Sequence, residues 1–166
     1  LWLDQPAGVG FSYGQETDSN EAMVSEDAYY FMQAFMKLYP QYSKNPLFIV
    51  GESYGGHYAP AIAHRIWQGN QQQSQDGTIE LNLAGLAIGN GLTDPEHQYP
   101  SYVDMGTHNS HNIVIFDDEV AEAMRQVIPR CTQLIHSCNS GDSMINDFAC
   151  QAAFVVCNTG LTSPYQ

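Results

Sequence analysis

Apolar residues recur at helical spacing in the segment that follows Asn20. Steps of three and four residues place them on one face of a helix, and they are Val24, Ala28, Phe31, Phe35 and Leu38. Pro40 is expected to end this helix, because proline lacks an amide hydrogen and disfavours the helical conformation in the residue before it. The pattern therefore predicts an amphipathic helix between about Asn20 and Pro40.

Two largely apolar runs, residues 47–50 and 81–88, predict strands of the kind that is buried on both faces of a parallel sheet. A helical pattern lies between them, and the polar residues 68–77 predict a surface loop. Residues 1–4 read as a further short strand. This alternation of strands and helices predicts an α/β fold with a mostly parallel, doubly wound sheet.

The character of the sequence changes after about residue 98. Strand patterns end, tyrosine, aspartate, histidine and cysteine become frequent, and residues 117–128 have a helical pattern. We therefore interpret residues 1–98 as a partial α/β core and residues 99–166 as the start of a helical insertion.

The composition narrows the possible partners. The chain has 166 residues, and its 18 acidic and 5 basic side chains give a formal net charge of −13. Such a charge argues against nucleic acid as a partner. No apolar run approaches the roughly 18 residues that cross a membrane. The sequence begins with Leu1 and ends without a terminal motif, so both ends are expected to be truncations.

Four cysteines lie in the last quarter of the chain: Cys131, Cys138, Cys150 and Cys157. Four cysteines allow three pairings, of which a nested one would link two facing segments. A zinc site is the alternative, although zinc-binding cysteines usually lie closer together in the sequence. Disulfides would indicate an oxidising route: secreted, vacuolar or lysosomal.

Residues 51–55 match the pattern G-x-S-x-G between a predicted buried strand and a predicted helix. This is the context of a nucleophile elbow, a sharp turn that exposes a serine above the sheet. Ser53 is then the candidate nucleophile, and the amide of Tyr54 is a candidate donor to the oxyanion. The tight turn is expected to require glycine at 51 and 55. The alternative is a glycine-rich structural turn that Ser53 caps.

A serine nucleophile needs a general base. His57 lies on the following helix, where it is expected to be a packed structural residue and not the base. In this fold the acid and the base come from distant later loops, so both are expected to lie outside this chain. The six histidines are His57, His64, His97, His108, His111 and His136.

Three segments together resemble the serine carboxypeptidase family. Residues 51–60 match its active-site motif, G-E-S-Y-(A/G)-G-(H/K)-Y-x-P. Residues 4–13 are similar to D-Q-P-x-x-x-G-(F/Y)-S-(Y/F), and residues 88–95 to I-G-N-G-x-x-D-P. The likeness, notably to carboxypeptidase Y-type enzymes of fungi, covers essentially the whole chain. It implies a partial α/β-hydrolase fold with a nucleophile elbow and the start of a disulfide-linked helical insertion.

The resemblance implies roles for single residues. Ser53 corresponds to the nucleophile, and Tyr54 to the residue whose amide completes the oxyanion hole. Glu52 corresponds to the glutamate that hydrogen-bonds the C-terminal carboxylate of the substrate. The pocket for the side chain before the scissile bond is lined in relatives at the positions of Leu92, Tyr99 and Tyr102.

The cysteines fall on the family's nested disulfides, which implies the pairs Cys131–Cys157 and Cys138–Cys150. Residues 105–119 depart from the pattern, because this segment has no cysteine where close relatives place another disulfide. The resemblance therefore does not specify the fold of this loop. No cofactor or metal ion is implied.

The implied function is hydrolysis of C-terminal residues of peptides and proteins through an acyl-enzyme on Ser53, in the secretory pathway. Two carboxylates approach closely only when they share a proton, so binding through Glu52 implies an acidic pH optimum. Without a base, this chain alone is expected to be inactive. The alternatives are a serine carboxypeptidase-like acyltransferase and an inactive structural or protective homologue.

Overall fold

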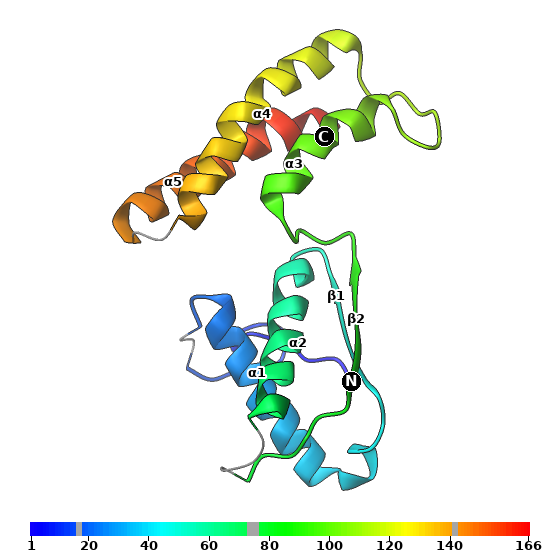
Figure 1. Ribbon diagram of the computed structural model, residues 1–166, viewed down its shortest axis with the longest axis vertical. Coiled ribbons are helices and arrows are strands. Elements are labelled where there is room, and N and C mark those ends of the chain that lie inside the picture. Colours follow the sequence, from blue (N-terminus) through cyan, green and yellow to red (C-terminus); the bar gives the residue numbers. More distant parts are fainter. Residues whose placement is uncertain (16–17, 73–76, 141–142) are drawn as a thin grey trace. The chain divides into compact units, whose positions relative to one another are not determined.

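The computed structural model describes residues 1–15, 18–72, 77–140 and 143–166. The chain divides into two compact units, residues 1–93 and residues 94–166 (Figure 1). The first contains both strands, and the second is helical.

Helix α1, Glu21–Leu38, begins and ends close to the predicted positions. The side-chain oxygen of Asn20 accepts a hydrogen bond from the amide of Met23 at 3.0 Å, which satisfies one of the unpaired amides of the first turn. After the helix, Pro40 opens a short 3-10 turn that ends at Tyr42.

The buried face of α1 is rotated from the one that the apolar spacing predicts. Tyr29, Met32 and Met36 are buried, together with Val24 and Ala28 of the predicted face. Two further residues of the predicted face, Phe31 and Leu38, were wrongly predicted to be buried. Phe31 is exposed, and Leu38 is 71% exposed. The helix packs through this rotated face against α2, Gly55–Gln71.

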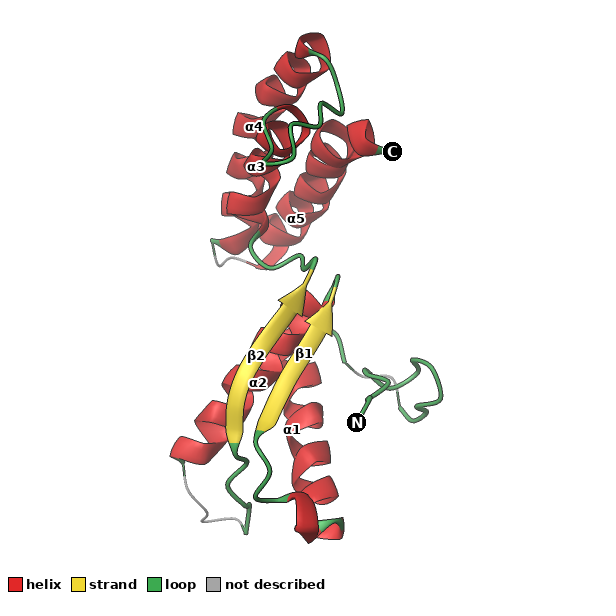
Figure 2. Ribbon diagram, turned by 90° about the vertical axis from the view of Figure 1, so that its right-hand side faces the viewer, coloured by secondary structure: helices red, strands yellow, loops and turns green. Residues whose placement is uncertain are grey.

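Strands β1, Leu47–Glu52, and β2, Leu83–Gly89, form a two-stranded parallel sheet. Their register places Glu52 opposite Gly89, so both strands end at the same edge of the sheet. Helix α2 connects the strands and packs on the sheet, and α1 lies on the same side (Figure 2). This is a β-α-β unit, in which residues at the carboxyl ends of the strands are brought together.

The prediction that the strands are buried on both faces is wrong for this structure. Exposure alternates along β1, where Phe48 is exposed and Val50 is 72% exposed. On β2, Leu86 and Ile88 are exposed as well. Both helices of this unit lie on one side of the sheet, so no described residues cover the second face.

Helix α2 extends into the segment that was expected to be a loop. The side chain of Asn70 donates to the carbonyl of Leu81 at 2.7 Å and accepts from its amide at 2.9 Å. This pair fixes the last turn of α2 against the chain that enters β2. Residues 73–76 of the expected loop lie outside the described residues.

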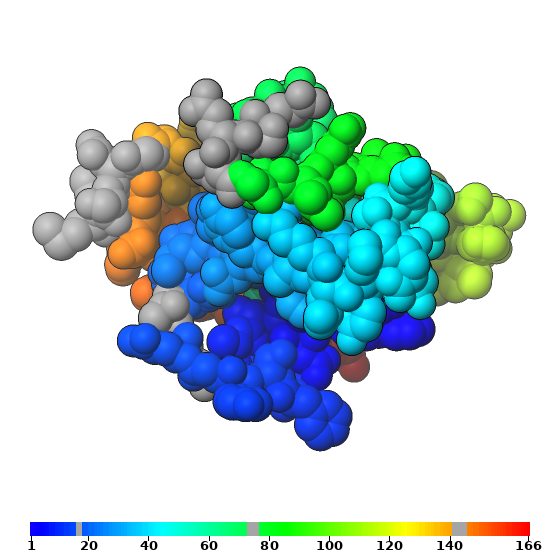
Figure 3. Space-filling model, turned by 90° about the horizontal axis from the view of Figure 1, so that it is seen from below, coloured from blue at the N-terminus to red at the C-terminus, as the bar shows by residue number. Residues whose placement is uncertain are grey.

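Residues 1–4 do not form the predicted strand. The carboxylate of Asp4 instead accepts a hydrogen bond from the amide of Phe11 at 3.0 Å, which closes a loop. Figure 3 shows the N-terminal segment, in dark blue, as a ridge beside the lighter blue surface of α1. A strand needs a hydrogen-bonding partner, and no described strand pairs with these residues.

The described residues of the second unit form three α-helices: α3, Pro95–Thr107, α4, Asp118–Asn139, and α5, Ser143–Cys157. A π-helical turn and a 3-10 turn follow α5. The predicted helix at 117–128 is confirmed and continues to residue 139, capped by the side chain of Asp117, which accepts from the amide of Val120 at 3.0 Å. The core of this unit lies between the helices.

The loop between α3 and α4 has an ordered fold of its own. The side-chain oxygen of Asn109 accepts from the amides of His111 and Ile113 at 3.1 and 3.2 Å. Its amide group donates to the carbonyl of Met105 at 2.9 Å. One asparagine thus organises the segment that departs from the family pattern.

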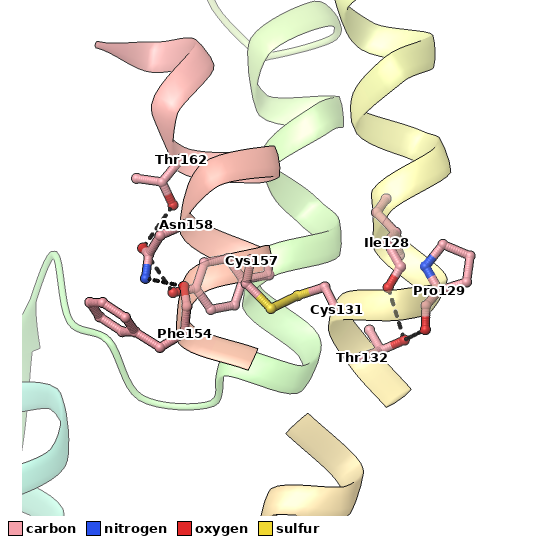
Figure 4. The surroundings of a disulfide bond; sticks show 9 residues. Ile128, Pro129, Cys131, Thr132, Phe154, Cys157, Asn158 and Thr162 are labelled. Carbon is pink, nitrogen blue, oxygen red and sulfur yellow. Dashed lines mark hydrogen bonds between the residues drawn. A yellow bond between two sulfur atoms is a disulfide. The ribbon is translucent and has the colours of Figure 1, made fainter. Parts of the chain in front are cut away.

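The two nested disulfides are confirmed. Cys131 pairs with Cys157, and Cys138 with Cys150, so both bonds connect α4 with α5. Figure 4 shows the first of them beside the start of the π-helical turn. No free cysteine remains. The described residues contain no cluster of side chains suited to a metal ion and no helix that is long and apolar enough to cross a membrane.

Candidate functional site

Ser53 lies on the sharp turn between the last residue of β1 and the first turn of α2. Its φ angle is +57°, in the left-handed region that costs a residue with a side chain roughly 1–2 kcal/mol. The residue is exposed to solvent. The turn therefore holds a serine hydroxyl outward in a strained backbone conformation, as a nucleophile elbow requires.

The turn at the end of β2 holds Ser53 through both of its backbone polar groups. The amide of Ser53 donates to the carbonyl of Gly89 at 3.1 Å, and its carbonyl accepts from the amide of Leu92 at 3.0 Å. Asn90, between them, has a φ of +46°, which asparagine tolerates better than most residues. The segment 89–92 is thus the second half of the elbow.

The glycines of the elbow differ in whether the surrounding atoms leave room for a side chain. A Cβ at Gly51 would lie 2.7 Å from the carbonyl oxygen of Gly55, and one at Gly56 would lie 2.7 Å from that of Leu92. A Cβ at Gly55 would meet nothing within 4 Å. The expectation that the turn requires glycine at 51 and 55 is therefore correct for the first position and wrong for the second. Gly56, at the contact with the turn after β2, is the second position that has no room for a Cβ.

Tyr54 precedes the first residue of α2 and has helical φ and ψ angles of −63° and −15°. Its amide belongs to the unpaired amides at the start of a helix, and no hydrogen bond to it is made by the described residues. The ring stacks on His57 at 4.7 Å between centroids, and the hydroxyl donates to the Glu21 carboxylate at 3.3 Å. Burial, followed by the nearby charge of Glu21, raises the pKa of Tyr54.

Glu52 and Leu92 lie beside Ser53 in the same unit. Glu52 is the last residue of β1 and is exposed, and Leu92 is half-buried beyond the end of β2. A groove of about 1400 Å³ runs along β1 and reaches Glu52 at one end. Most of its lining comes from apolar residues, and several of them, such as Met32 and Ile62, belong to the core cluster of this unit.

Tyr99 and Tyr102 belong to the second unit, where the structure brings them together. Their rings meet edge to face at 5.6 Å. Tyr99 is buried in the core and its hydroxyl donates to Asn158 at 3.2 Å, and the hydroxyl of Tyr102 accepts from Gln98 at 3.1 Å. Both therefore have a packing role in this unit, and their place in a substrate pocket stays a prediction.

His57 packs against Tyr54, and its Nδ1 atom is buried without a hydrogen-bond partner among the described residues. Among the described residues, no histidine forms a hydrogen bond with the Ser53 hydroxyl. The pair His97–Asp94, at 2.7 Å, lies on the exposed first turn of α3 in the second unit. The hydrogen bond from His97 lowers the pKa of Asp94.

Sequence reasoning missed two contacts of the elbow. The first is the attachment of Ser53 to the turn at 89–92, for which an asparagine between two glycines after a strand was an available signal. The second is the contact of Tyr54 with Glu21, for which the sequence offers no signal, because it joins two helices that are distant along the chain.

The chain is similar to known proteins over nearly its whole length. The family model described as serine carboxypeptidase matches residues 1–163. Serine carboxypeptidase 3 of Oryza sativa subsp. japonica is 42% identical over 98% of this chain and 31% of its own. Carboxypeptidase Y of Candida albicans is 37% identical over 100% of this chain and 29% of its own. The chain thus spans about a third of the length of these curated relatives.

A solved structure has a similar fold. It is Kex1Δp, a prohormone-processing carboxypeptidase from Saccharomyces cerevisiae, with a TM-score of 0.66 and 24% sequence identity. The match covers 93% of this chain and 34% of that one. At this level of identity the likeness concerns the fold.

Proposed function

Because the chain belongs to the serine carboxypeptidase family, we propose that Ser53 is the nucleophile of a serine-type carboxypeptidase that removes C-terminal residues from peptides and proteins. The observation that carries the proposal is the exposed Ser53 at a φ of +57° between β1 and α2. Strained conformations of this kind concentrate at functional sites. A serine that served only to cap α2 would have no need of it.

In this proposal residues 1–98 are part of an α/β-hydrolase core. The parallel β-α-β unit with the elbow at its strand ends supports that interpretation. Residues 99–166 are the start of a helical insertion, or cap. The disulfide-linked helices α4 and α5 support this second part.

Catalysis proceeds by acyl transfer. The Ser53 oxygen attacks the carbonyl carbon of the last peptide bond while a histidine from another part of the protein takes its proton. The oxyanion accepts a hydrogen bond from the Tyr54 amide, and one such donor contributes about 2.7–4 kcal/mol to the transition state. The C–N bond breaks as the histidine returns the proton to the leaving amine, and water then hydrolyses the ester on Ser53.

Glu52, adjacent to the nucleophile, binds the C-terminal carboxylate of the substrate. Since the two carboxyl groups must share a proton in the complex, activity is highest at acidic pH. By the family resemblance, Leu92, Tyr99 and Tyr102 are the candidate residues for binding the preceding side chain. The disulfides support a place in the secretory pathway, in a vacuole or lysosome or outside the cell.

The test is the release of the C-terminal amino acid from a blocked dipeptide by the full-length protein, with Ser53→Ala as the control. We expect release that Ser53→Ala abolishes, with an optimum at acidic pH. Glu52→Gln, which keeps a hydrogen-bond donor without a charge, is expected to lose less activity than the unsubstituted protein between about pH 5 and pH 7. Ester exchange with a small alcohol without peptide hydrolysis would favour an acyltransferase. No turnover of either substrate would favour an inactive homologue.

A further inference from the structure

The elbow is connected to a second helix through one side chain. Tyr54 stands at the start of α2, and Glu21 is the first residue of α1. The Tyr54 hydroxyl donates to the Oε1 atom of Glu21 at 3.3 Å, across 33 positions of sequence. The carboxylate lies in the first turn of its own helix, where the helix dipole favours negative charge.

The other neighbours of the Tyr54 ring come from its own helix. His57 stacks on the ring with an angle of 9° between the planes, and Tyr58 meets it edge to face at 5.0 Å. Neither can fix the elbow against the rest of the unit, because both move with α2. Among the described contacts of this side chain, the one with Glu21 alone reaches another element.

The peptide unit between Ser53 and Tyr54 carries the amide that the proposed function assigns to the oxyanion. Its carbonyl oxygen, on Ser53, accepts from the amides of Leu92 and Gly56, each at 3.0 Å, whereas the described residues make no hydrogen bond to its Tyr54 amide. The amide nitrogen is bonded directly to the Cα atom of Tyr54, so its distance from the oxyanion changes when that Cα atom shifts. A ring that is fixed to α1 limits this shift.

On these grounds we propose that Glu21 is a positioning residue for the oxyanion-hole amide, acting through the hydroxyl of Tyr54. The inference rests on the proposed function. It adds a residue 32 positions before the nucleophile to the machinery of the site, and it assigns the Tyr54 hydroxyl a role separate from that of its ring.

The test uses the full-length protein with Glu21→Ala, Tyr54→Phe, the double variant and Glu21→Gln. Tyr54→Phe keeps the ring, and Glu21→Gln keeps an acceptor oxygen. We expect Glu21→Ala and Tyr54→Phe each to lower kcat about 3- to 10-fold, a fraction of the loss for a removed oxyanion donor, with little change in KM. The double variant is expected to match the single ones, because both remove the same contact. Glu21→Gln is expected to retain most of the activity.

A second measurement separates positioning from a general loss of stability. A peptidyl boronate forms a tetrahedral adduct with the serine, so its affinity should fall by the same factor as kcat/KM in Glu21→Ala. Glu80→Ala, at an exposed carboxylate of the same unit, is the matched control and should change neither value. Additive effects in the double variant, an unchanged boronate affinity, or equal losses in Glu21→Gln and Glu21→Ala would overturn the inference. An unsubstituted protein that neither turns over the dipeptide nor binds the boronate would overturn the proposed function, and this inference with it.

Discussion

Alanine at the two adjacent glycines of the elbow is expected to have opposite effects. At Gly56 the new Cβ would lie 2.7 Å from the carbonyl oxygen and 2.8 Å from the amide nitrogen of Leu92. That amide also donates to the carbonyl of Ser53 at 3.0 Å. The methyl group therefore pushes on the turn that holds the nucleophile. At Gly55 the new Cβ would have no neighbour within 4 Å.

The magnitudes follow from these contacts. Overpacking against a backbone that must move costs about 1–3 kcal/mol, so Gly56→Ala lowers the free energy of unfolding by that amount. Gly55→Ala has no clash and restricts the unfolded chain, which raises the free energy of unfolding by about 0.4–1 kcal/mol. The two variants are therefore expected to differ by about 1.4–4 kcal/mol.

Urea unfolding of the full-length protein measures this difference, and the rate of dipeptide hydrolysis reports the elbow itself. We expect Gly56→Ala to lose both stability and activity, and Gly55→Ala to keep both. The family motif agrees with this difference, because it accepts alanine or glycine at position 55 but only glycine at position 56. Equal stabilities of the two variants, or a Gly56→Ala protein with full activity, would refute the geometric reasoning.

Three further predictions concern the strained serine, an ion pair and the disulfides. Ser53→Gly is expected to abolish hydrolysis and to raise the free energy of unfolding by about 1 kcal/mol, because glycine adopts a positive φ without the Cβ penalty; a lower urea midpoint would contradict this. Arg65 lowers the pKa of Glu26 through its hydrogen bond, so this pair contributes stability above the unfolded-state pKa of the carboxyl and loses it as the pH falls through the lower folded-state pKa. Glu26→Gln should therefore make the urea midpoint less dependent on pH between about pH 6 and pH 3, and an unchanged dependence would be evidence against the pair. Loop entropy makes each disulfide contribute about 3 kcal/mol to the free energy of unfolding, but the two bonds differ in exposure: Cys131 and Cys157 are 0% and 1% exposed, whereas Cys138 and Cys150 are half-buried. Mild reductant and alkylation, followed by mass spectrometry, should therefore show that the Cys138–Cys150 bond opens first; its opening second would contradict this.

For α1 the sequence predicted where the helix begins and ends better than which face it buries. Asn20 and Pro40 mark the ends of α1 because capping and the missing proline amide act locally. The buried face of α1 was harder, because apolar side chains such as Phe31 and Met32 occur around much of the helix. Periodicity then fits more than one face, and the packing of α2 decides between them.

Features that depend on a partner elsewhere in the fold were the least predictable. Residues 1–4 have the composition of a strand, but a strand also requires a neighbour with free backbone groups. At the candidate site, the turn at Ser53 could be predicted from its local pattern, because the elbow is a local turn between two predicted elements. The role of Leu92 in holding that turn, and the clash that singles out Gly56, arise only when β2 lies beside β1.

If Ser53 is an activated nucleophile, a fluorophosphonate will label it. The full-length protein would be incubated with the probe at mildly acidic pH and then digested for peptide mapping. We expect an adduct on the peptide that contains Ser53 and none in Ser53→Ala. A folded protein that forms no adduct at this serine would contradict it.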